Sequence, residues 1–497
     1  MFNEFILTPF VKSAYKFKDH NAFCINEKYF TYKKLAEEIS KIRIALQGEN
    51  LLNKIIGLVV NDDIETYASI FAIWLEGFAY LPLSPNQPIK RSIEILSQAK
   101  VSLIIDSENC FPSSKHKVIN SRSLEFSEVS LELKKIPDDF LVYILFTSGS
   151  TGKPKGVPIT RKNLSSFVKS FLEVGFEIDY NDRCLQCFDL TFDVSVQSFL
   201  IPLLKGACVY TIPHDQIKYS YIYGLFEEHR LTFAVLAPSM LRYLRPYFNE
   251  IKVKSLKYCI VTAEASPVDL LMEWSYCIPK ATVYDFYGPT EATIYCTYNL
   301  FNKKGKNKHL NGMLSIGKPM NGFKAIIIDE RGNSLGVNKK GELCISGDQL
   351  TPGYWENSQK SEESFFEKEW MGKSRRFYKT GDYCSFESDG SILLSGRIDY
   401  QVKIQGYRIE LGEIEYHARE YLLGQNTVAL TFKNKTGNTE IALCIEGELA
   451  STKNLLTYLK AKMPYYMVPT KIISEKEFPL NSNGKTDRIA LKKEIGL

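Results

Sequence analysis

LFTSGSTGKPKGVPIT, residues 145–160, joins an apolar segment to a loop that is rich in hydroxyl groups and glycines. Glycine leaves backbone N–H groups open to close approach, and Lys153 and Lys155 add positive charge, so the loop suits a polyphosphate. It does not satisfy the Walker pattern, because Gly152 and Lys153 are followed by proline and position 147 is not glycine. Taken alone, such a loop is more often a surface connection than a nucleotide site.

Short β-branched segments alternate with longer helical patterns on both sides of this loop. The alternation begins with KIIGLVV (54–60), IETYASIFAIWLEG (64–77), FAYLPL (78–83) and VSLIID (101–106), and it recurs in FAVLAPS (233–239), YCIVTAE (258–264) and ATVYDFYG (281–288). It predicts βαβ units and a largely parallel sheet. After about Gly317 short strands and turns predict a β-rich subdomain, and the last hundred or so residues resemble a small α+β domain.

The length and composition limit which class of protein this chain can be. A chain of 497 residues exceeds what one hydrophobic core usually organises, so two or more domains are expected. The formal net charge of +5 is small for this length and indicates no nucleic-acid partner. No apolar segment is long enough to span a membrane, and the first residues lack the order of a signal peptide, so a cytoplasmic location is expected.

The cysteines carry no evident chemistry. There are 11, an odd number, and they are scattered mostly through apolar stretches, which is typical of reduced core residues rather than of disulfides. Cys184 and Cys187 form a CxxC pair, but no second Cys or His pair stands at ligand spacing. We therefore interpret this pair as part of a buried strand.

The loop at 145–160 stands among eight other motifs. In chain order they are WLEGFAYLPLSP (74–85), FDVS (192–195), DFYGPTEAT (285–293), GELCISG (341–347), YKTGD (378–382), GRIDYQVKIQGYRIELGEIE (396–415), MPYYMVP (463–469) and NGKTDR (483–488). With FTSGSTGKPKG between the first two, this series resembles the adenylate-forming superfamily, which includes peptide-synthetase adenylation domains, acyl-CoA synthetases and luciferases. The resemblance covers nearly the whole chain and is strongest to the amino-acid adenylation subgroup.

The resemblance implies ATP and Mg²⁺ as cofactors. Activation of a carboxylate by ATP is an in-line displacement at the α-phosphate, where cations and fixed dipoles must meet developing charge. By resemblance, Thr290 binds the α-phosphate and Glu291 holds Mg²⁺, a role that suits a hard carboxylate oxygen. The pyrophosphate end lies against the loop, whose implied contact residues are Thr147, Ser148, Gly149, Ser150, Thr151, Gly152 and Lys155.

The same resemblance implies which residues bind the nucleoside and which residue is the catalytic cation. Tyr287 stacks on adenine, Asp382 accepts hydrogen bonds from the ribose hydroxyls, and Arg397 also contacts the nucleotide. Asp285 stands where the family more often has asparagine, and it keeps the acceptor for the adenine amino group. Lys485 enters from the C-terminal domain and counters the repulsion between substrate carboxylate and phosphate.

Asp193 decides the substrate class. It precedes an apolar helical pattern and could be its N-cap, whereas in amino-acid adenylating relatives the matching residue pairs with the substrate α-ammonium. Apart from Asp193 and Lys485 the pocket positions are uncharged and predict a small apolar amino acid. Six positions, Asp193, Val194, Gln197, Leu236, Val261 and Ala263, look like the pattern of proline-activating domains. Tyr407 in GYRIE also resembles D-alanine:carrier protein ligases. The uncharged pocket residues are Val194, Gln197, Leu236, Val261, Ala263, Phe286, Ile294 and Tyr295.

The resemblance further implies two domains and a partner. Residues 1–398 form an N-terminal core of α/β class, and residues 399–497 form a mobile domain that turns about a hinge at Asp399. The aminoacyl group then passes to the phosphopantetheine thiol of a carrier protein. We expect a separate carrier, because no carrier segment follows the last motif. The alternatives are an acyl-CoA or aryl-CoA ligase and a non-catalytic nucleotide-binding protein.

Overall fold

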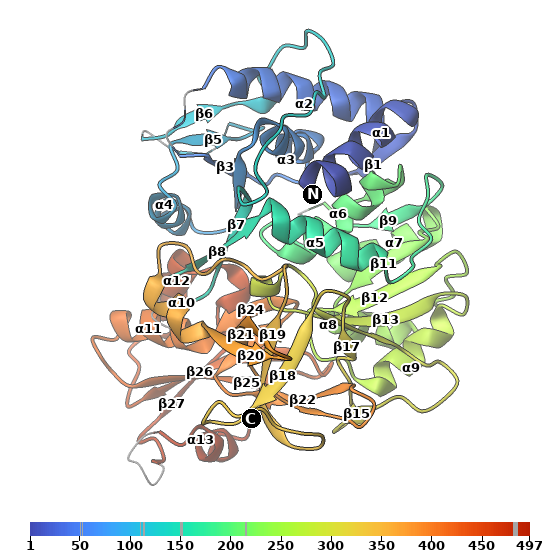
Figure 1. The fold of residues 1–497 in the computed structure, drawn as a ribbon. Helices are drawn as coiled ribbons and strands as arrows, with labels where there is room; N and C mark the ends of the chain where they lie inside the picture. Colours follow the sequence, from blue (N-terminus) through green and yellow to red (C-terminus); the bar gives the residue numbers. More distant parts are fainter. Residues whose placement is uncertain are drawn as a thin grey trace. The chain divides into compact units, whose positions relative to one another are not determined.

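The computed structural model describes residues 1–49, 51, 53–109, 111–112, 115–149, 153–213, 216–480 and 486–497 (Figure 1). The chain divides into two compact units. The first contains Met1–Pro85, Leu96–Leu145 and Gly156–Ile398, and the second contains Asn86–Ile95, Phe146–Lys155 and Asp399–Leu497. The second unit thus includes two segments, 86–95 and 146–155, that the sequence-based division placed in the N-terminal core.

A six-stranded sheet, in the order β6-β5-β3-β4-β7-β8, leads into the loop at 148–154. The recorded pairs among β3, β4, β5, β6 and β7 are parallel, as the alternating pattern predicts. The strands are β3 (Ile55–Val59), β4 (Ala79–Leu83), β5 (Leu103–Ile105), β6 (Lys117–Ile119), β7 (Leu141–Thr147) and β8 (Lys155–Thr160). Every residue of β3 and β4 is buried, which explains why both read as continuous apolar runs.

A nine-stranded sheet, in the order β17-β14-β13-β12-β11-β9-β10-β1-β2, forms the second layer of the first unit. Its central strands are parallel, and β2, β14 and β17 add antiparallel edges. The strands are β1 (Asn21–Ile25), β2 (Lys28–Thr31), β9 (Arg183–Leu185), β10 (Cys208–Tyr210), β11 (Phe233–Leu236), β12 (Tyr258–Thr262), β13 (Thr282–Tyr287), β14 (Thr297–Leu300) and β17 (Lys318–Pro319). The largely parallel arrangement confirms the predicted α/β class.

The helix α3 (Ile64–Glu76) illustrates how local sequence sets an element. The Asp63 side chain accepts a hydrogen bond from the Thr66 N–H at the start of the helix, and Gly77 ends it in the left-handed region with φ 85°. Almost every residue between these ends is buried, and the helix packs against β3, β4 and α2 (Tyr32–Gln47) (Figure 1). A helix that is apolar on most faces therefore lies inside the unit.

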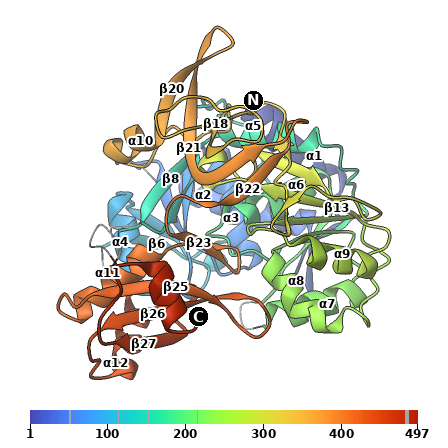
Figure 2. The same ribbon diagram turned by 90° about the horizontal axis from the view of Figure 1, so that it is seen from below.

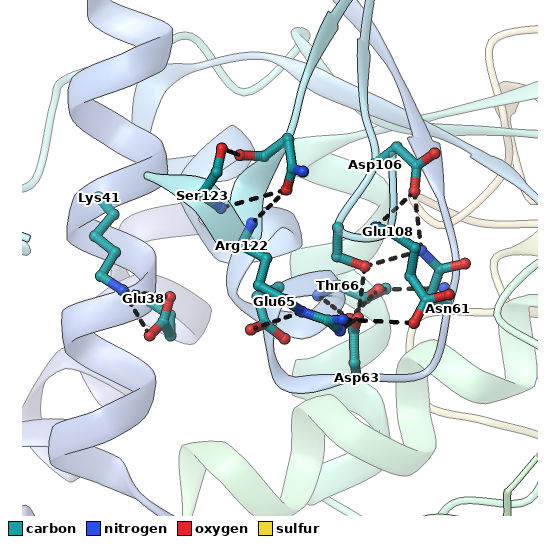
Figure 3. A network of polar contacts seen from close by, with 12 residues as sticks. Glu38, Lys41, Asn61, Asp63, Glu65, Thr66, Asp106, Glu108, Arg122 and Ser123 are labelled. Carbon is teal, nitrogen blue, oxygen red and sulfur yellow. Dashed lines mark hydrogen bonds and ion pairs between the residues drawn. The ribbon is translucent and has the colours of Figure 1, made fainter. Parts of the chain in front are cut away.

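Arg122, which follows β6, forms ion pairs with carboxylates at the start of α3 and after β5. Its guanidinium pairs with Asp63 at 2.9 Å and lies 3.6 Å from Glu65 and 3.5 Å from Glu108 (Figure 3). Since Asp63 also caps α3, one carboxylate serves the helix and the loop together. This network fixes the path of the chain between the sheet and the helix.

The β-rich region that the sequence predicts after Gly317 is a five-stranded antiparallel sheet, β18-β19-β21-β20 with β22 on β21. Its strands are β18 (Lys324–Ile328), β19 (Lys340–Ser346), β20 (Phe365–Trp370), β21 (Lys373–Phe386) and β22 (Ile392–Arg397), and a small hairpin pairs β15 (His309–Leu310) with β16 (Met313–Leu314). The register of β21 and β22 places Asp382 opposite Arg397.

The second unit carries a three-stranded sheet beside helices α11 and α12 (Figure 2). Its elements are β23 (Gln401–Ile404), β24 (Tyr407–Glu410), α11 (Leu411–Tyr421), β25 (Thr427–Lys433), β26 (Thr439–Glu446), α12 (Thr452–Lys462), η5 (Tyr465–Met467), β27 (Lys471–Glu475) and α13 (Arg488–Glu494). The hairpin from β23 to β24 turns at Gln405 and Gly406, both with positive φ, as a tight two-residue turn requires.

The remaining helices connect and cover the strands. They are η1 (Asn3–Leu7), α1 (Thr8–Lys16), α4 (Ile89–Gln98), η2 (Ser121–Ser123), α5 (Arg161–Leu172), α6 (Asp193–Leu204), α7 (Lys218–Glu228), α8 (Pro238–Leu244), η3 (Arg245–Tyr247), α9 (Val268–Cys277), η4 (Thr290–Ala292) and α10 (Ser358–Ser364). Among the helices in the described ranges, none combines the length and the apolar character that a membrane span requires.

The ten cysteines in the described ranges are all buried, and none of them forms a disulfide. Cys184 lies in β9, and Cys187 follows that strand. Burial raises the pKa of the Cys187 thiol to about 12, which disfavours a thiolate nucleophile or metal ligand there. Both cysteines are buried, as the sequence predicts, but only Cys184 lies in the strand.

Candidate active site

Tyr287, Asp382 and Arg397 meet in the first unit. Tyr287, the last residue of β13, donates its hydroxyl to Asp382 Oδ2 at 2.5 Å, and Arg397 Nη1 donates to Asp382 Oδ1 at 3.1 Å. The Asp382 N–H donates to Thr380 Oγ1, which fixes the backbone of the YKTGD segment. The structure therefore brings together three of the residues expected at the nucleoside.

Asp285 lies at the carboxyl end of the parallel strands. It is buried in β13 and accepts a hydrogen bond from the Ser266 hydroxyl. The register sets Leu236 beside Val261 and Val261 beside Asp285, so residues expected at the amino acid and at the adenine lie in one row. Ligands of parallel sheets bind at this end of the strands.

Glu291 is a fully buried carboxylate on the short helix η4, which begins at Thr290. The Tyr354 hydroxyl donates to Glu291 Oε1 at 2.7 Å, and the Tyr378 hydroxyl lies 3.4 Å from that of Tyr354. A backbone bond from the Thr351 N–H to the Glu291 carbonyl holds the turn itself. Sequence reasoning predicted a metal-binding role for Glu291 but did not name its hydrogen-bond partner Tyr354, whose only sequence signal is its place in GYW.

Hard carboxylate oxygen is the kind of ligand that Mg²⁺ accepts. Among the described residues no group of three or more His, Cys, Asp or Glu side chains could hold a metal ion alone. A metal at Glu291 would thus take its other ligands from phosphate or water, which matches how Mg²⁺ binds beside nucleotides. The residues present fit such an ion.

Backbone strain gathers at the turn after β13. Thr293 and Ile294 have φ values of 55° and 75°, and Ala263 after β12 has 72°, in the region that favours glycine. A Cβ on Gly288 would come within 2.4 Å of the Ile294 carbonyl oxygen, so only glycine fits where the two backbones meet. Strained non-glycine residues are commonly found at ligand sites.

Asp193 is the first residue of α6, and Phe192 is the N-cap residue. The expectation that Asp193 could be the N-cap is therefore wrong by one position, although an acidic side chain in the first turn still suits the helix dipole. Asp193 is buried, and its charge adds to burial in raising the pKa of Tyr80, Tyr143 and Tyr295. Sequence reasoning missed Tyr80 and Tyr143 as its neighbours.

The other expected pocket residues are buried apart from the half-buried Ala263. Phe286 and Tyr295 lie with ring centroids 4.9 Å apart, and the Thr262 hydroxyl donates to the Phe286 carbonyl. Gln197 follows Asp193 by one helical turn, and neither polar atom of its carboxamide has a partner among the described residues. A buried polar side chain in this state is costly and suits a position that contacts a ligand.

The glycine-rich loop, which lies within the segment 146–155 of the second unit, is predicted to bind phosphate, and four of its predicted contact residues are described. The Thr147 hydroxyl lies 3.5 Å from the Lys155 carbonyl, and a Cβ on Gly149 would come within 2.0 Å of the Lys153 carbonyl. Ser148, Gly149 and Lys155 bind residues of β24 and α11. The predicted residues Ser150, Thr151, Gly152 and Lys485 lie outside the described residues. The predicted hinge residue, Asp399, accepts a hydrogen bond from the Gln401 N–H.

Sequence comparison shows which family the chain belongs to. The pattern of the AMP-binding enzyme family matches residues 10–355. Zwittermicin A synthase ZmaJ of Bacillus cereus is 32% identical over 500 residues, which cover 97% of this chain and 93% of that protein. Tyrocidine synthase 2 of Brevibacillus parabrevis is 31% identical over 493 residues, which cover 97% of this chain. The chain spans only 13% of the length of tyrocidine synthase 2.

Solved structures show the same fold. The adenylation domain AlmE of Vibrio cholerae, in complex with glycyl-adenosine-5'-phosphate, has a TM-score of 0.86 at 24% identity and covers 98% of this chain and 97% of its own. PA1221, which contains adenylation and PCP domains, has a TM-score of 0.84 at 22% identity and covers 98% of this chain and 84% of its own. On the motif series, the fold and these matches, the chain belongs to the AMP-binding enzyme family within the adenylate-forming superfamily.

Proposed function

We propose that the protein joins an amino acid to AMP with release of pyrophosphate and then transfers the aminoacyl group to the phosphopantetheine thiol of a carrier protein. The observation that carries the proposal is Asp193, a buried carboxylate at the start of α6 among tyrosine hydroxyls. A buried anion of this kind favours a substrate with a cationic α-ammonium over a plain fatty or aryl acid. The complex of AlmE with an aminoacyl adenylate supports the reaction class.

Each of the predicted site residues has a step in this reaction. Asp382 and Arg397 hold the ribose side of ATP, and Tyr287, whose hydroxyl donates to Asp382, stacks on the adenine. Thr290 and Glu291 face the phosphates, where Mg²⁺ would neutralise charge on the transferring group. Lys485 approaches the carboxylate and the α-phosphate, countering the repulsion between the two anions as they meet.

The choice of amino acid follows from the pocket residues. The set Asp193, Val194, Gln197, Leu236, Val261 and Ala263 favours L-proline, and Phe286 and Tyr295 shorten the space in which a side chain fits. D-alanine is the second candidate, from the GYRIE segment. PA1221 combines adenylation and PCP domains, which supports a carrier partner, and a carrier on a separate chain is our specific proposal.

Pyrophosphate exchange dependent on the amino acid tests the function. We expect exchange with one of the common amino acids, with both enantiomers of proline and alanine included in the series. Asp193→Ala should lower kcat/KM for the amino acid by at least about a hundredfold, because the substrate ammonium loses a buried charged partner. Exchange that survives this change, or that responds to aryl or fatty acids instead, would favour an acyl-CoA or aryl-CoA ligase.

Lys485→Ala separates the two half-reactions. It should abolish adenylate formation and leave thioester formation from supplied aminoacyl adenylate intact, since the lysine acts where the anhydride forms. We further propose that residues 399–497 turn about Asp399 between these steps. Loss of both half-reactions in Lys485→Ala would contradict this division of roles, and ATP binding without exchange for any acid would indicate a non-catalytic protein.

A further inference from the structure

The glycine-rich loop of the second unit, which is predicted to bind phosphate, forms hydrogen bonds and an ion pair with residues 408–413 of the same unit. The Ser148 hydroxyl donates to the Arg408 carbonyl at 3.0 Å, and the Glu410 N–H donates to Ser148 Oγ at 3.0 Å. The Gly149 N–H donates to Glu413 Oε2 at 3.2 Å. Lys155 Nζ lies 3.3 Å from Glu410 Oε1. Three of the groups expected to meet pyrophosphate thus contact the segment at 408–413.

Glu413 is a buried anion that is held from two sides. Its Oε1 accepts a bond from Arg91 Nη1 at 2.5 Å, while its Oε2 accepts from Gly149, and the side chain has no exposed surface. A buried carboxylate is tolerated only where such donors replace water. This carboxylate oxygen accepts from a backbone N–H of a glycine-rich loop, a donor that a phosphate oxygen can also use.

Glu410 forms an ion pair with Lys155 of the same loop. Its carboxylate contacts Lys155 Nζ and the Gln401 side chain, and it is nearly fully buried. Gln401 in turn accepts from Arg408 Nε at 2.9 Å, so the hairpin of β23 and β24 holds the carboxylate in place. The loop therefore has one carboxylate on its backbone N–H and a second on its lysine.

We infer that Glu410 and Glu413 compete with the polyphosphate of ATP, and with pyrophosphate, for Ser148, Gly149 and Lys155. One N–H cannot serve a carboxylate and a phosphate oxygen together, and two anions at one site repel each other. The inference rests on the proposed function for its ligand. ATP must displace the two carboxylates to bind, and they can return only after pyrophosphate has left, which makes adenylate formation harder to reverse.

Hydrogen–deuterium exchange of the intact chain tests the competition directly. Saturating inorganic pyrophosphate with Mg²⁺ should increase exchange in peptides spanning residues 401–415, because their contacts with the loop are lost. Peptides of α12 should not change. If pyrophosphate binds and exchange at 401–415 stays equal or falls, the competition is excluded. If neither pyrophosphate nor ATP binds, the proposed function fails as well.

The affinity for pyrophosphate of variants in which glutamine replaces Glu410 or Glu413 is the second measurement. Glu413→Gln should bind pyrophosphate about tenfold more tightly, equivalent to about 1.4 kcal/mol, because the charged competitor is gone. Glu410→Gln should act in the same direction and serves if Glu413→Gln does not fold. The control is Glu420→Gln, which removes the same charge from α11 where the side chain is exposed and pairs with Lys462. Unchanged or weaker binding in folded Glu410→Gln or Glu413→Gln, or an equal gain in the control, would overturn the inference.

Discussion

At the scale of single residues, the expected nucleotide site is built from buried carboxylates that tyrosine hydroxyls hold in place. Asp382 accepts from Tyr287, and Glu291 accepts from Tyr354. Each bond holds one carboxylate oxygen in a fixed direction. Hydrogen bonds to charged groups are worth more than neutral ones, so the hydroxyls are positioning groups with a measurable effect.

Tyr354→Phe should raise the Mg²⁺ concentration needed for half-maximal pyrophosphate exchange by about tenfold, because Glu291 loses the bond that orients it. The ring is kept, so its packing against Phe365 remains. Binding of MgATP, measured by calorimetry at several Mg²⁺ concentrations, should weaken in parallel. Tyr276→Phe, which changes an exposed tyrosine, is the control. A Mg²⁺ dependence equal to that of the wild type would exclude the positioning role.

At the scale of elements, the turn from β13 to η4 joins two backbone segments without room for a side chain. Gly288 lies against the Ile294 carbonyl, and Ile294 itself is in the left-handed region. The strain is concentrated where Asp285, Tyr287 and Glu291 must keep fixed relative positions. The turn is therefore the element that sets the geometry of the expected site.

Gly288→Ala should destabilise the protein by about 1–3 kcal/mol and lower kcat/KM for ATP, because the new methyl group forces the turn apart. The matched control is Gly336→Ala. A Cβ there meets no atom within 4 Å, and the residue is not in the left-handed region, so its stability should be unchanged or slightly higher. Denaturation midpoints and exchange kinetics check both variants. A stable, fully active Gly288→Ala would contradict the argument.

At the scale of the whole molecule, folding stability should depend on a carboxyl group away from the expected site. Burial raises the pKa of Asp62 to about 7, against 3.8 for an ordinary aspartate, while the Tyr67 hydroxyl donates to it at 2.5 Å. Between about pH 4 and pH 7 the folded protein keeps a proton on Asp62 that the unfolded chain releases. Raising the pH through this range therefore favours unfolding.

Asp62→Asn should remove this part of the pH dependence, which for a pKa raised from 3.8 to about 7 amounts to at most roughly 4 kcal/mol across the range. Asparagine keeps an acceptor for Tyr67 and tolerates the positive φ of 53° at this position. Thermal midpoints of the variant should fall less than those of the wild type between pH 5 and about pH 7.5. Parallel curves for the two proteins would show that Asp62 does not titrate in this range.

Much of the fold could be predicted from the sequence, because apolar periodicity and turn residues act locally. The segments KIIGLVV and IETYASIFAIWLEG became β3 and α3, and the strands β18 to β22 form the expected β-rich sheet. The start of α6 was misplaced by one residue, since the cap preference of aspartate does not show which residue takes helical dihedrals. The order of the motifs identified the family.

Contacts between distant parts of the chain could not be predicted, because nothing in a linear pattern specifies which hydroxyl or carboxylate will meet which partner. Tyr354 lies 63 residues from Glu291, and Glu413 lies 264 residues from Gly149, yet each pair is hydrogen-bonded. The sequence by itself determined the α/β class, the family and the residue types at the expected site. Only the tertiary structure decided that the loop expected to hold phosphate is occupied by Glu410 and Glu413, since burial leaves those carboxylates no water and the loop supplies the donors.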